Sequence, residues 1–546
     1  MKTLKIQIEE KIKRQLETLW PENLTKVNFA VERPKEERFG DYSTNLAMQL
    51  APLLGKNAME IGHQLIKGVV WPAAIGKAMV VAPGFINCYL SEDWLRRQVS
   101  RQAKNLKFGQ SDFGRGKKVQ VEFISANPTG PLHLGNGRGA FTGDVLANVL
   151  KAAGFAVQRE YYLNDMGHQI EVLAESVRIR FFQQQGIKLD YPDYCYKGDY
   201  VIELAKKLAT VNNYKLKNID KVRQRIRERV LKLMMDEIKR FVTKRLKIKF
   251  DRWFSEKSLY QRKLTDKVIN IFKGKELLYK QEGALFLKTT FFGDDKDRVL
   301  LKKDGEPTYF LSDIAYHYDK FALRKFDKAI DFWGADHFGH QGRMQAALRA
   351  LDLEGKLDIV IFQLVRLIKG GQEIKMSKRG GTFVTLEELI DEVGPDVARF
   401  FFLMYAADTH LDFDLDLGRE KSEKNPVYYV QYAHARICSI IKKAAKYTRK
   451  AKQQDREPLR KKEELNLVKE IIKLPEIIEE VAGNYEVQKL PFYAQNLAAK
   501  FHDFYTVCRV IDNDKLKIKR YELIKLTKFA LMKVLALMGI SAPDRM

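Results

Sequence analysis

Residues 113–420 alternate strand-like runs with helical stretches, and this alternation limits the possible folds more than any other feature of the sequence. Four runs rich in β-branched and aromatic residues stand out, namely VQVEFIS, AVQREYYL, AIDFWGA and DIVIFQLVRLI. Strands that alternate with helices are typical of βαβ units, whose strands pair in parallel. We therefore expect an α/β region with a parallel sheet. A basic helical insertion at about 175–250 interrupts the pattern, and either a solvated surface or an RNA contact explains its charge.

The preceding region, residues 1–112, mixes helix and strand signals and predicts an α+β domain. In FGDYSTNLAMQLAPLLG, Asp41 or Ser43 is expected to cap a helix. The apolar positions of that helix are Leu46, Leu50, Leu53 and Leu54. The run VVAPGFINCYLS is strand-like and is broken by Pro83 and Gly84.

The last region, residues 421–546, contains no convincing strand. Apolar residues recur there with a period close to 3.6, as in NPVYYVQYAHARICSIIKKAAKY and KLTKFALMKVLALMGI. The pattern predicts an all-α helical bundle.

Length and composition limit the class of protein. A chain of 546 residues, 45% of them hydrophobic, is long enough for several folded domains. No run reaches the roughly 20 apolar residues that cross a bilayer, and the charged N-terminus lacks the apolar core of a signal peptide. The four cysteines are far apart and form no C-x-x-C pair, which argues against zinc and disulfides. We expect a cytoplasmic protein with no membrane partner and no zinc.

The charge of the chain is strongly positive. Lysine and arginine total 96 against 70 acidic residues, a formal net charge of +26. Such an excess serves solubility in some proteins and binds a polyanion in others. Because the excess is spread along helical segments rather than confined to a tail, we favour a nucleic-acid partner.

The stretch FISANPTGPLHLGNGRG, residues 123–139, follows a predicted strand and joins one histidine to several glycines. It formally fits the dinucleotide fingerprint G-x-G-x-x-A, with Glu160 near the expected ribose-binding acid, but two prolines and a histidine separate the strand from the glycines. A helix that begins near Leu134 or Gly135 is a better interpretation, since its free N–H groups would face a phosphate. An ordinary Gly-rich turn between strand and helix explains this stretch equally well.

A second stretch, KGGQEIKMSKRGG at 369–381, holds four cationic side chains, three of them between two glycine pairs. A basic loop flanked by glycines can bring an ammonium to a charge that develops during a reaction. A lone basic loop in a lysine-rich protein is more often a surface turn. This stretch therefore indicates a function only in combination with the stretch at 123–139.

The two stretches together resemble class I aminoacyl-tRNA synthetases. PLHLGN is similar to the His-x-Gly-His element of that class, and KMSKR is similar to its lysine loop. Further stretches are similar to arginyl-tRNA synthetases, namely VEFISANPTGPLH, EYYLNDMGHQI, TLEELIDEVGPDVARFFFL, HLDFDLDL, NPVYYVQYAHARICSI and the terminal SAPDRM. The resemblance covers nearly the whole chain. It implies a Rossmann-type catalytic domain that joins arginine to ATP as arginyl-adenylate and then transfers arginine to the terminal adenosine of tRNA-Arg.

The resemblance also implies which residues act on ATP. The catalytic residues would be His133, Asn136, Lys375 and Lys378. The ATP-binding residues would be His133, Gly135, Asn136, Gly137, Met376, Ser377 and Lys378. Positioning and charge stabilisation suffice for this chemistry, and Mg²⁺ would accompany ATP as a substrate rather than occupy a protein cage.

The expected arginine site combines carboxylates with a polar aromatic wall, as a planar guanidinium requires. Its residues by resemblance are Glu122, Ser125, Asn127, His133, Tyr309, Asp313 and Asp336. We expect Asp313 to pair with the guanidinium and Asn127 to hold the α-amino group, with Tyr309 and Asp313 on one helix face. Without the resemblance, Glu122 reads as a structural salt bridge and Asp313 as a helix cap.

Two positions depart from the family pattern. Asn136 stands at the position where the element usually ends in histidine. Asparagine keeps a neutral donor of similar reach but has no titratable role. Arg379 replaces the commoner serine of the lysine loop, a minor change. We expect activity to be retained.

Two acidic or histidine-rich stretches resemble metal sites only superficially. Asp336, His337 and His340 in ADHFGHQ have metal-like spacing, but we expect them to contact arginine or adenosine. A second set, namely Asp412, Asp414, Asp416 and Glu423, imitates an EF-hand. Leu417 occupies the position where that loop needs glycine, so an edge strand is the better prediction there.

The expected domains follow from these regions. Residues 1–112 would bind the tRNA elbow, 113–420 would carry catalysis, and 421–546 would bind the anticodon. The candidate RNA contacts are Phe85, Asn87, Tyr505, Arg545 and Met546, for each of which a core or turn role is equally open. The partners would be tRNA-Arg, L-arginine and ATP, and we expect a monomer.

Two other functions remain as alternatives. A non-catalytic RNA-binding relative would keep the basic surface but lose one of the two loops. A dinucleotide-dependent oxidoreductase would leave the KMSKR stretch and the helical C-terminal region unexplained.

Overall fold

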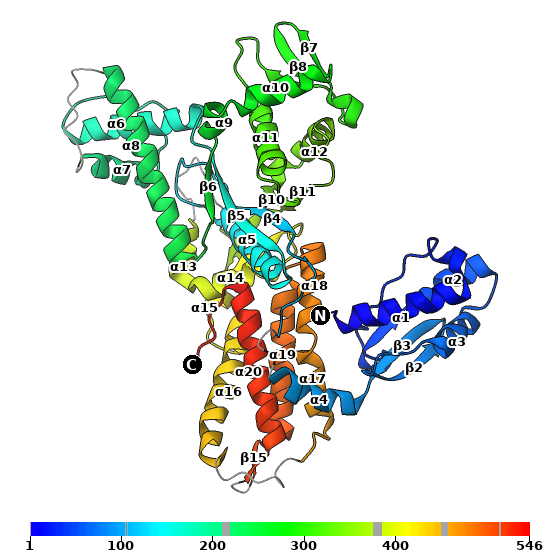
Figure 1. The fold of residues 1–546 in the computed structure, drawn as a ribbon. Coiled ribbons are helices and arrows are strands. Elements are labelled where there is room, and N and C mark those ends of the chain that lie inside the picture. Colours follow the sequence, from blue (N-terminus) through cyan, green and yellow to red (C-terminus); the bar gives the residue numbers. More distant parts are fainter. Residues whose placement is uncertain are drawn as a thin grey trace.

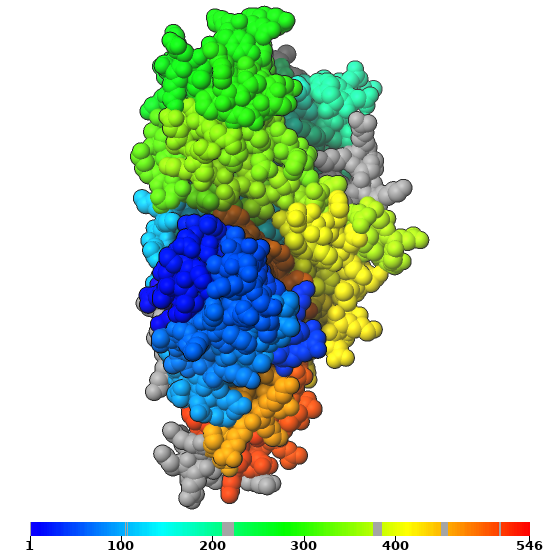
Figure 2. Space-filling view, turned by 90° about the vertical axis from the view of Figure 1, so that its right-hand side faces the viewer, coloured from blue at the N-terminus to red at the C-terminus, as the bar shows by residue number. Residues whose placement is uncertain are grey.

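The computed structural model describes residues 2–103, 105, 108–209, 219–374, 385–448, 457–512 and 515–546. Three parts are distinguished along the molecule (Figure 1). Figure 2 shows the N-terminal part in blue on one face, between the catalytic region in green above and the C-terminal helices in orange and red below. Among the described helices, none is long and apolar enough to span a membrane.

The middle part is built on a five-stranded parallel sheet. Its strands are β4 (Lys118–Glu122), β5 (Ala156–Leu163), β6 (Arg252–Ser255), β10 (Lys328–Gly334) and β11 (Leu357–Phe362). The order across the sheet is β11-β10-β4-β5-β6, and every neighbouring pair is parallel. The strand order therefore reverses between β4 and β10, and ligands of such sheets bind in the crevice at the carboxyl ends beside that point. The predicted Rossmann-type sheet is confirmed.

Helix α5 (Leu134–Ala152) makes the crossover from β4 to β5 and packs against the sheet. It is buried on nearly all sides because α13 (Leu386–Val393), α14 (Pro395–Leu403), α18 (Leu474–Asn484) and α20 (Ile518–Met538) also contact it. A helix with such surroundings is rich in small and apolar residues, as the sequence LGNGRGAFTGDVLANVLKA is.

The predicted helical insertion is confirmed as three helices, α6 (His168–Gln184), α7 (Asp199–Ala209) and α8 (Ile219–Arg240), which lie against one another. A second insertion, which the sequence did not indicate, precedes β10. Its elements are α9 (Lys257–Gln261), α10 (Leu264–Gly274), β7 (Leu278–Gln281), β8 (Ala284–Leu287), β9 (Arg298–Leu301) and α11 (Tyr309–Tyr318). Its strands are only four residues long and form an antiparallel sheet. In the sequence, the lysine- and aspartate-rich turns between these strands resemble surface loops, which is why the insertion was not predicted.

Further elements complete the catalytic region. They are α12 (His340–Ala350), β12 (Val365–Lys369), β13 (Gln372–Glu373), β14 (Leu411–Asp414) and α15 (Leu415–Arg419). β12 pairs with both β13 and β14, and β14 lies at the edge of this small sheet, as predicted for the LDFD run. Asp414 accepts backbone hydrogen bonds from Asp416 and Leu417 at the start of α15, so its carboxylate acts as a helix cap.

The N-terminal part is an α+β unit, as predicted. Its elements are α1 (Leu4–Leu19), β1 (Tyr42–Thr44), α2 (Leu46–Leu54), α3 (Ala58–Gly68), β2 (Ile75–Val81) and β3 (Phe85–Leu90), with the sheet order β1-β3-β2. The expected cap of α2 was wrong. Ser43 lies in β1, and Asp41 accepts a hydrogen bond from the Leu90 backbone N–H at 2.8 Å, so both residues serve the sheet instead of the helix.

The C-terminal part is the predicted helical bundle. It consists of α16 (Pro426–Thr448), α17 (Lys462–Ile471), α18, α19 (Lys489–Val507) and α20, with a minimal hairpin of β15 (Ile511–Asp512) and β16 (Lys515–Leu516). Helix α4 (Glu92–Ala103), although it lies within the first 112 residues, contacts α17 and α20. Arg33 and Tyr42 both hydrogen-bond Glu476 of α18, which ties the N-terminal unit to the bundle as well.

A buried ion pair joins the catalytic region to the bundle. Arg399 on α14 donates to Asp144 on α5 at 2.6 Å and to the carbonyl oxygens of Leu246 and Met538. Its side chain is almost fully buried. The guanidinium therefore connects α5 and α14 to the end of α20.

We predict that Arg399→Met destabilises the protein by about 3 kcal/mol, because it removes the cation of a buried pair. The value lies at the low end for such pairs, since Arg159 stays 3.4 Å from Asp144. Chemical denaturation measures the change. Arg366→Met is the matched control, because its pair with Asp412 is exposed to solvent and contributes little to stability. Equal losses in the two variants would contradict this prediction.

Candidate active site

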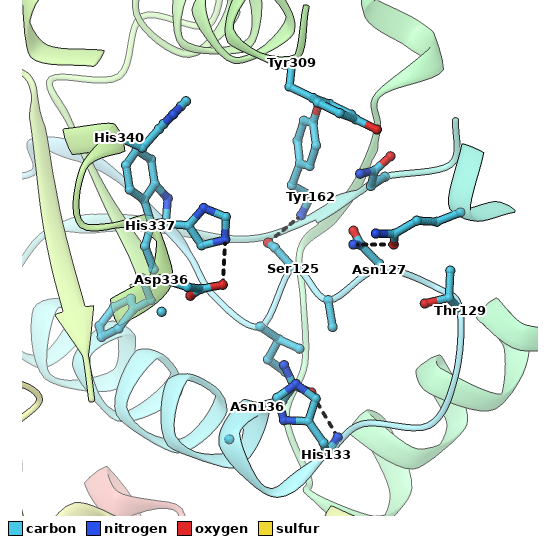
Figure 3. A pocket seen from close by; sticks show the side chains of 18 of the residues that line it. Ser125, Asn127, Thr129, His133, Asn136, Tyr162, Tyr309, Asp336, His337 and His340 are labelled. Carbon is cyan, nitrogen blue, oxygen red and sulfur yellow. Dashed lines mark hydrogen bonds and ion pairs between the residues drawn. The ribbon is translucent and has the colours of Figure 1, made fainter. Parts of the chain in front are cut away.

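A cleft of about 2280 Å³ opens at the carboxyl ends of the central strands, where the strand order reverses. Three of the segments that line it carry most of the predicted residues: the loop 123–133 with the first turn of α5, helix α11, and residues 334–337 after β10. Figure 3 shows Ser125, Asn127, His133, Tyr309 and Asp336 around this space.

The loop after β4 holds an uncommon backbone conformation. Ile124 and Ser125 have φ values of 68° and 39°, a region that β-branched residues rarely adopt. The Ser125 hydroxyl donates to Glu122 at 3.1 Å and accepts from the Tyr162 backbone N–H at 3.0 Å. The surrounding structure therefore fixes a strained turn at the edge of the cleft, as is common at functional sites.

The N-terminus of α5 points into the cleft. His133 is the N-cap residue, and the side-chain oxygen of Asn136 accepts a hydrogen bond from the His133 backbone N–H at 3.0 Å (Figure 3). This bond uses the carbonyl of the amide and leaves its NH₂ group as the donor that the sequence predicted. The first backbone N–H groups of a 19-residue helix and its positive end are a combination that can bind an anion.

The two glycines of this turn have different roles. Gly135 lines the cleft, and a Cβ atom there would lie 3.1 Å from the His133 ring. Gly137 is buried and lies outside the cleft lining, and its contact with ATP stays a prediction. A Cβ atom on Gly137 would lie 2.8 Å from Leu386 and 3.1 Å from Phe402, so close helix packing explains that glycine.

The predicted lysine loop, with Lys375, Met376, Ser377, Lys378 and Arg379, lies outside the described residues. The described residues on either side of it are informative. Ile374 donates its backbone N–H to Leu367, and Thr385 forms a β-bridge with His133. The structure thus brings the end of that segment next to the histidine element, although about 250 residues separate them in the chain.

Helix α11 carries two of the predicted arginine-site residues. Tyr309 and Asp313 are one turn apart and both line the cleft, as predicted. Thr308 is the N-cap of this helix, which excludes the helix-cap role for Asp313. The Asp313 carboxylate hydrogen-bonds His340 at 2.9 Å, and Tyr309 is 63% exposed.

The other predicted arginine-site residues lie across the cleft from α11. Asn127 lines the cleft and donates its side-chain amide to Gln169 at 2.9 Å. Glu122 is largely buried yet also lines the cleft, and one of its oxygens lies 2.8 Å from the Lys320 ammonium. Glu122 is therefore part of a buried salt bridge as well as part of the cleft wall.

Glu256, which the sequence reasoning missed, is a further carboxylate in the cleft. It follows β6 directly, and only 3% of it is exposed. Burial and the neighbouring Asp313 raise the pKa of Glu256 to about 7. No ion pair with Glu256 occurs among the described residues. An acidic residue directly after a strand of the parallel sheet, as in RWFSE, was the signal that could have identified it.

The predicted histidine cluster does not converge on one point. Asp336 and His337 are exposed and lie 3.6 Å apart, whereas His340 pairs with Asp313 and contacts Trp333. Elsewhere, among the described residues, His434, Cys438 and Asp544 lie close enough to share an ion, but Lys528 already pairs with Asp544 at 3.2 Å. All four cysteines are free thiols. The absence of zinc stays a prediction.

The candidate RNA contacts differ in accessibility. Phe85 is partly exposed, but Asn87 is 1% exposed and accepts a hydrogen bond from Ser43, so its side chain joins β3 to β1 instead of facing a partner. Tyr505 accepts a hydrogen bond from Arg436 at 2.7 Å and is partly exposed. Arg545 and Met546 are exposed at the C-terminus.

Comparison with known families assigns the three parts of the chain. Residues 6–90 match the family model for the arginyl tRNA synthetase N terminal domain. Residues 99–399 match tRNA synthetases class I (R), catalytic domain, and residues 430–546 match the DALR anticodon binding domain.

Individual relatives agree with these matches. The chain is 44% identical to arginine–tRNA ligase 1 of Halalkalibacterium halodurans, with 94% of each chain covered, and 43% identical to arginine–tRNA ligase of Bacillus subtilis, with 95% and 94% covered. A crystal structure described as a putative arginyl-tRNA synthetase from Campylobacter jejuni superposes with a TM-score of 0.77 at 33% identity, covering 84% of this chain and 100% of that one. The chain belongs to the arginyl-tRNA synthetase family.

Proposed function

We propose that this chain activates L-arginine with ATP and transfers it to the 3′-terminal adenosine of tRNA-Arg. The observation that carries the proposal is the cleft at the strand reversal, where an anion-binding helix terminus faces a group of carboxylates. One side suits a triphosphate and the other suits a guanidinium. Neither a non-catalytic RNA-binding relative nor an oxidoreductase explains both halves of the cleft, and the family match favours the enzyme.

On the ATP side, the N-terminus of α5 would bind the phosphates, and Asn136 would donate to them through its NH₂ group. Lys375 and Lys378 would neutralise the charge that builds up on the phosphates as the arginine carboxylate attacks the α-phosphorus and pyrophosphate leaves. Mg²⁺ would arrive with ATP, since it keeps most of its ligands on phosphate and water. No covalent bond to the protein is needed.

On the arginine side, Asp313 would pair with the guanidinium, and Asn127 would hold the α-amino end. Glu122 and Glu256 would add negative charge around the guanidinium. Desolvated carboxylates prefer an ionic partner, and a planar guanidinium with five donors matches more than one of them. The exposed ring of Tyr309 is free to close over the ligand.

The remaining parts would bind tRNA. Residues 1–112 would contact the elbow, with Phe85 as the exposed candidate, and 421–546 would contact the anticodon through Tyr505, Arg545 and Met546. Residues 113–420 would form the catalytic domain between them. We further propose that the protein acts as a cytoplasmic monomer.

Arginine-dependent exchange of pyrophosphate into ATP tests this function, with and without tRNA-Arg and with the other amino acids as controls. We expect exchange with arginine, and a requirement for tRNA-Arg by analogy with the family. If the protein binds tRNA-Arg but supports no exchange under either condition, it is an RNA-binding relative and the proposal is wrong.

We predict that Asp313→Ala raises the KM for arginine by at least about 30-fold, because loss of one partner of a buried charged pair costs about 2 kcal/mol or more. The KM for ATP stays within about twofold of the wild type, since Asp313 does not face the α5 terminus. Steady-state exchange kinetics give both constants. Asp352→Ala, which removes an exposed carboxylate paired with Lys275, is the control. An unchanged arginine KM would exclude Asp313 from the site.

We predict that Asn136→His leaves a working enzyme, with kcat within about tenfold of the wild type, because imidazole keeps a neutral donor and an acceptor for the His133 N–H. Exchange kinetics and the melting temperature of the variant are the measurements. Complete loss of exchange in a folded variant would show that the turn requires the amide.

We predict that arginine affinity improves as pH rises through about 7. Glu256 is neutral below its pKa of about 7 and negative above it, and only the negative form attracts a guanidinium. The groups that face it include Asp313, Asp165 and Tyr162. The arginine KM should change by up to about tenfold per pH unit below the pKa. Glu256→Gln should flatten this profile. A variant that keeps the wild-type pH profile would rule out Glu256 as its source.

A further inference from the structure

Lys320 is a fully buried lysine next to the active-site cleft. It lies in η5 (Asp319–Leu323), the π-helical turn that continues α11, and its exposed fraction is 0%. A buried ammonium is costly unless acidic partners surround it closely. The partners of the Lys320 ammonium therefore indicate the role of this side chain.

The Lys320 ammonium joins two strands at the point where the sheet order reverses. It lies 2.8 Å from the Glu122 carboxylate at the end of β4 and 2.8 Å from both oxygens of Asp331 in β10. Glu122 and Asp331 are direct neighbours in the parallel pairing of these strands. The Tyr316 ring covers the ammonium at 4.2 Å. Both carboxylates line the cleft, but of the two only Glu122 also has a hydrogen bond to the strained loop, through Ser125.

His317 extends the network to α11. One ring nitrogen lies 2.9 Å from the Asp331 carboxylate, and the other lies 2.7 Å from the backbone carbonyl of Asp313. A carbonyl oxygen can only accept a hydrogen bond, so the nitrogen facing Asp313 is the donor. The same buried group of side chains thus holds the backbone of Asp313 on one side of the cleft and the carboxylate of Glu122 on the other.

Charge explains why Glu122 needs this support. Burial raises the pKa of Glu122, and the neighbouring Asp331 raises it further, whereas Lys320 opposes both effects. Without the ammonium, two buried carboxylates would stand side by side, and one of them would take up a proton or turn away. A protonated or displaced Glu122 no longer offers a fixed negative charge to the cleft.

We infer that Lys320 is a positioning residue for arginine recognition: its ammonium, shared between Glu122 and Asp331, holds the Glu122 carboxylate ionised and directed at the guanidinium site. Lys320 acts through Glu122 and does not touch the substrate. The inference rests on the proposed role of Glu122 in the arginine site and goes beyond it by naming the group that makes that role possible.

A double-mutant cycle tests this coupling in the full-length enzyme. The four proteins are the wild type, Glu122→Gln, Lys320→Met and the double variant, and the constants are the KM values for arginine and ATP and kcat, measured by pyrophosphate exchange with saturating tRNA-Arg. We expect Lys320→Met to raise the arginine KM by about tenfold in the wild-type background and by less than about threefold in the Glu122→Gln background. The ATP KM should stay within about twofold in all four proteins.

Other outcomes have distinct meanings. An equal effect of Lys320→Met in both backgrounds, or a parallel rise in both KM values, would mean a general structural role and would overturn the inference. An unchanged arginine KM in Glu122→Gln alone would instead remove Glu122 from the arginine site, which is a failure of the proposed function.

Two more variants protect the test against loss of folding. Lys320→Gln still fills the site and can donate one hydrogen bond, so it should show the same non-additivity with a smaller rise in arginine KM. Lys328→Met, on the same strand as Asp331 but at a partly exposed pair with Asp358, should leave every constant unchanged. Melting temperatures report folding in each case, and additive behaviour in the folded Lys320→Gln cycle would equally overturn the inference.

Discussion

The parallel pairing of β4 with β10 is the constraint on which the rest of the site depends. It places the end of β4, with Glu122 and the strained loop, next to β10 and its Asp331. Along the chain, α5 follows β4, and α11 with its π-helical turn precedes β10. The cleft, its anion-binding helix terminus and its carboxylates all follow from that arrangement. Because the two buried carboxylates of Glu122 and Asp331 lie side by side, the seam also requires a buried cation, and Lys320 supplies it.

Long, regular signals in the sequence predicted the fold well. The four strand-like runs correspond to four of the five strands of the parallel sheet, and β6 was not predicted. The period of 3.6 at the C-terminus corresponds to helices, because both patterns reflect burial of one face or of a whole strand. The small sheet β7-β8-β9 was missed, since its four-residue strands carry too few side chains to show a period. The cap of α2 was wrong because Asp41 and Ser43 have tertiary partners in β1 and β3, which local sequence cannot reveal.

The sequence likewise predicted some residues of the site and missed others. Residues within motifs, such as His133, Asn136, Tyr309 and Asp313, line the cleft as predicted. Glu256 and Lys320 were not predicted, because each comes from a different insertion or turn and meets the site only through the fold. Gly137 lies inside a motif, but close helix packing against Leu386 and Phe402 already explains that glycine, so its contact with ATP stays a prediction.

A crystal structure of the enzyme with L-arginine and an unreactive ATP analogue tests the central claim most directly. The account predicts that the guanidinium lies within hydrogen-bond distance, about 3 Å, of the Asp313 carboxylate, with the phosphates at the N-terminus of α5. Glu122 should keep its contact with Lys320 in that complex. A guanidinium bound away from Asp313 and Glu122, or phosphates bound away from α5, would contradict the account.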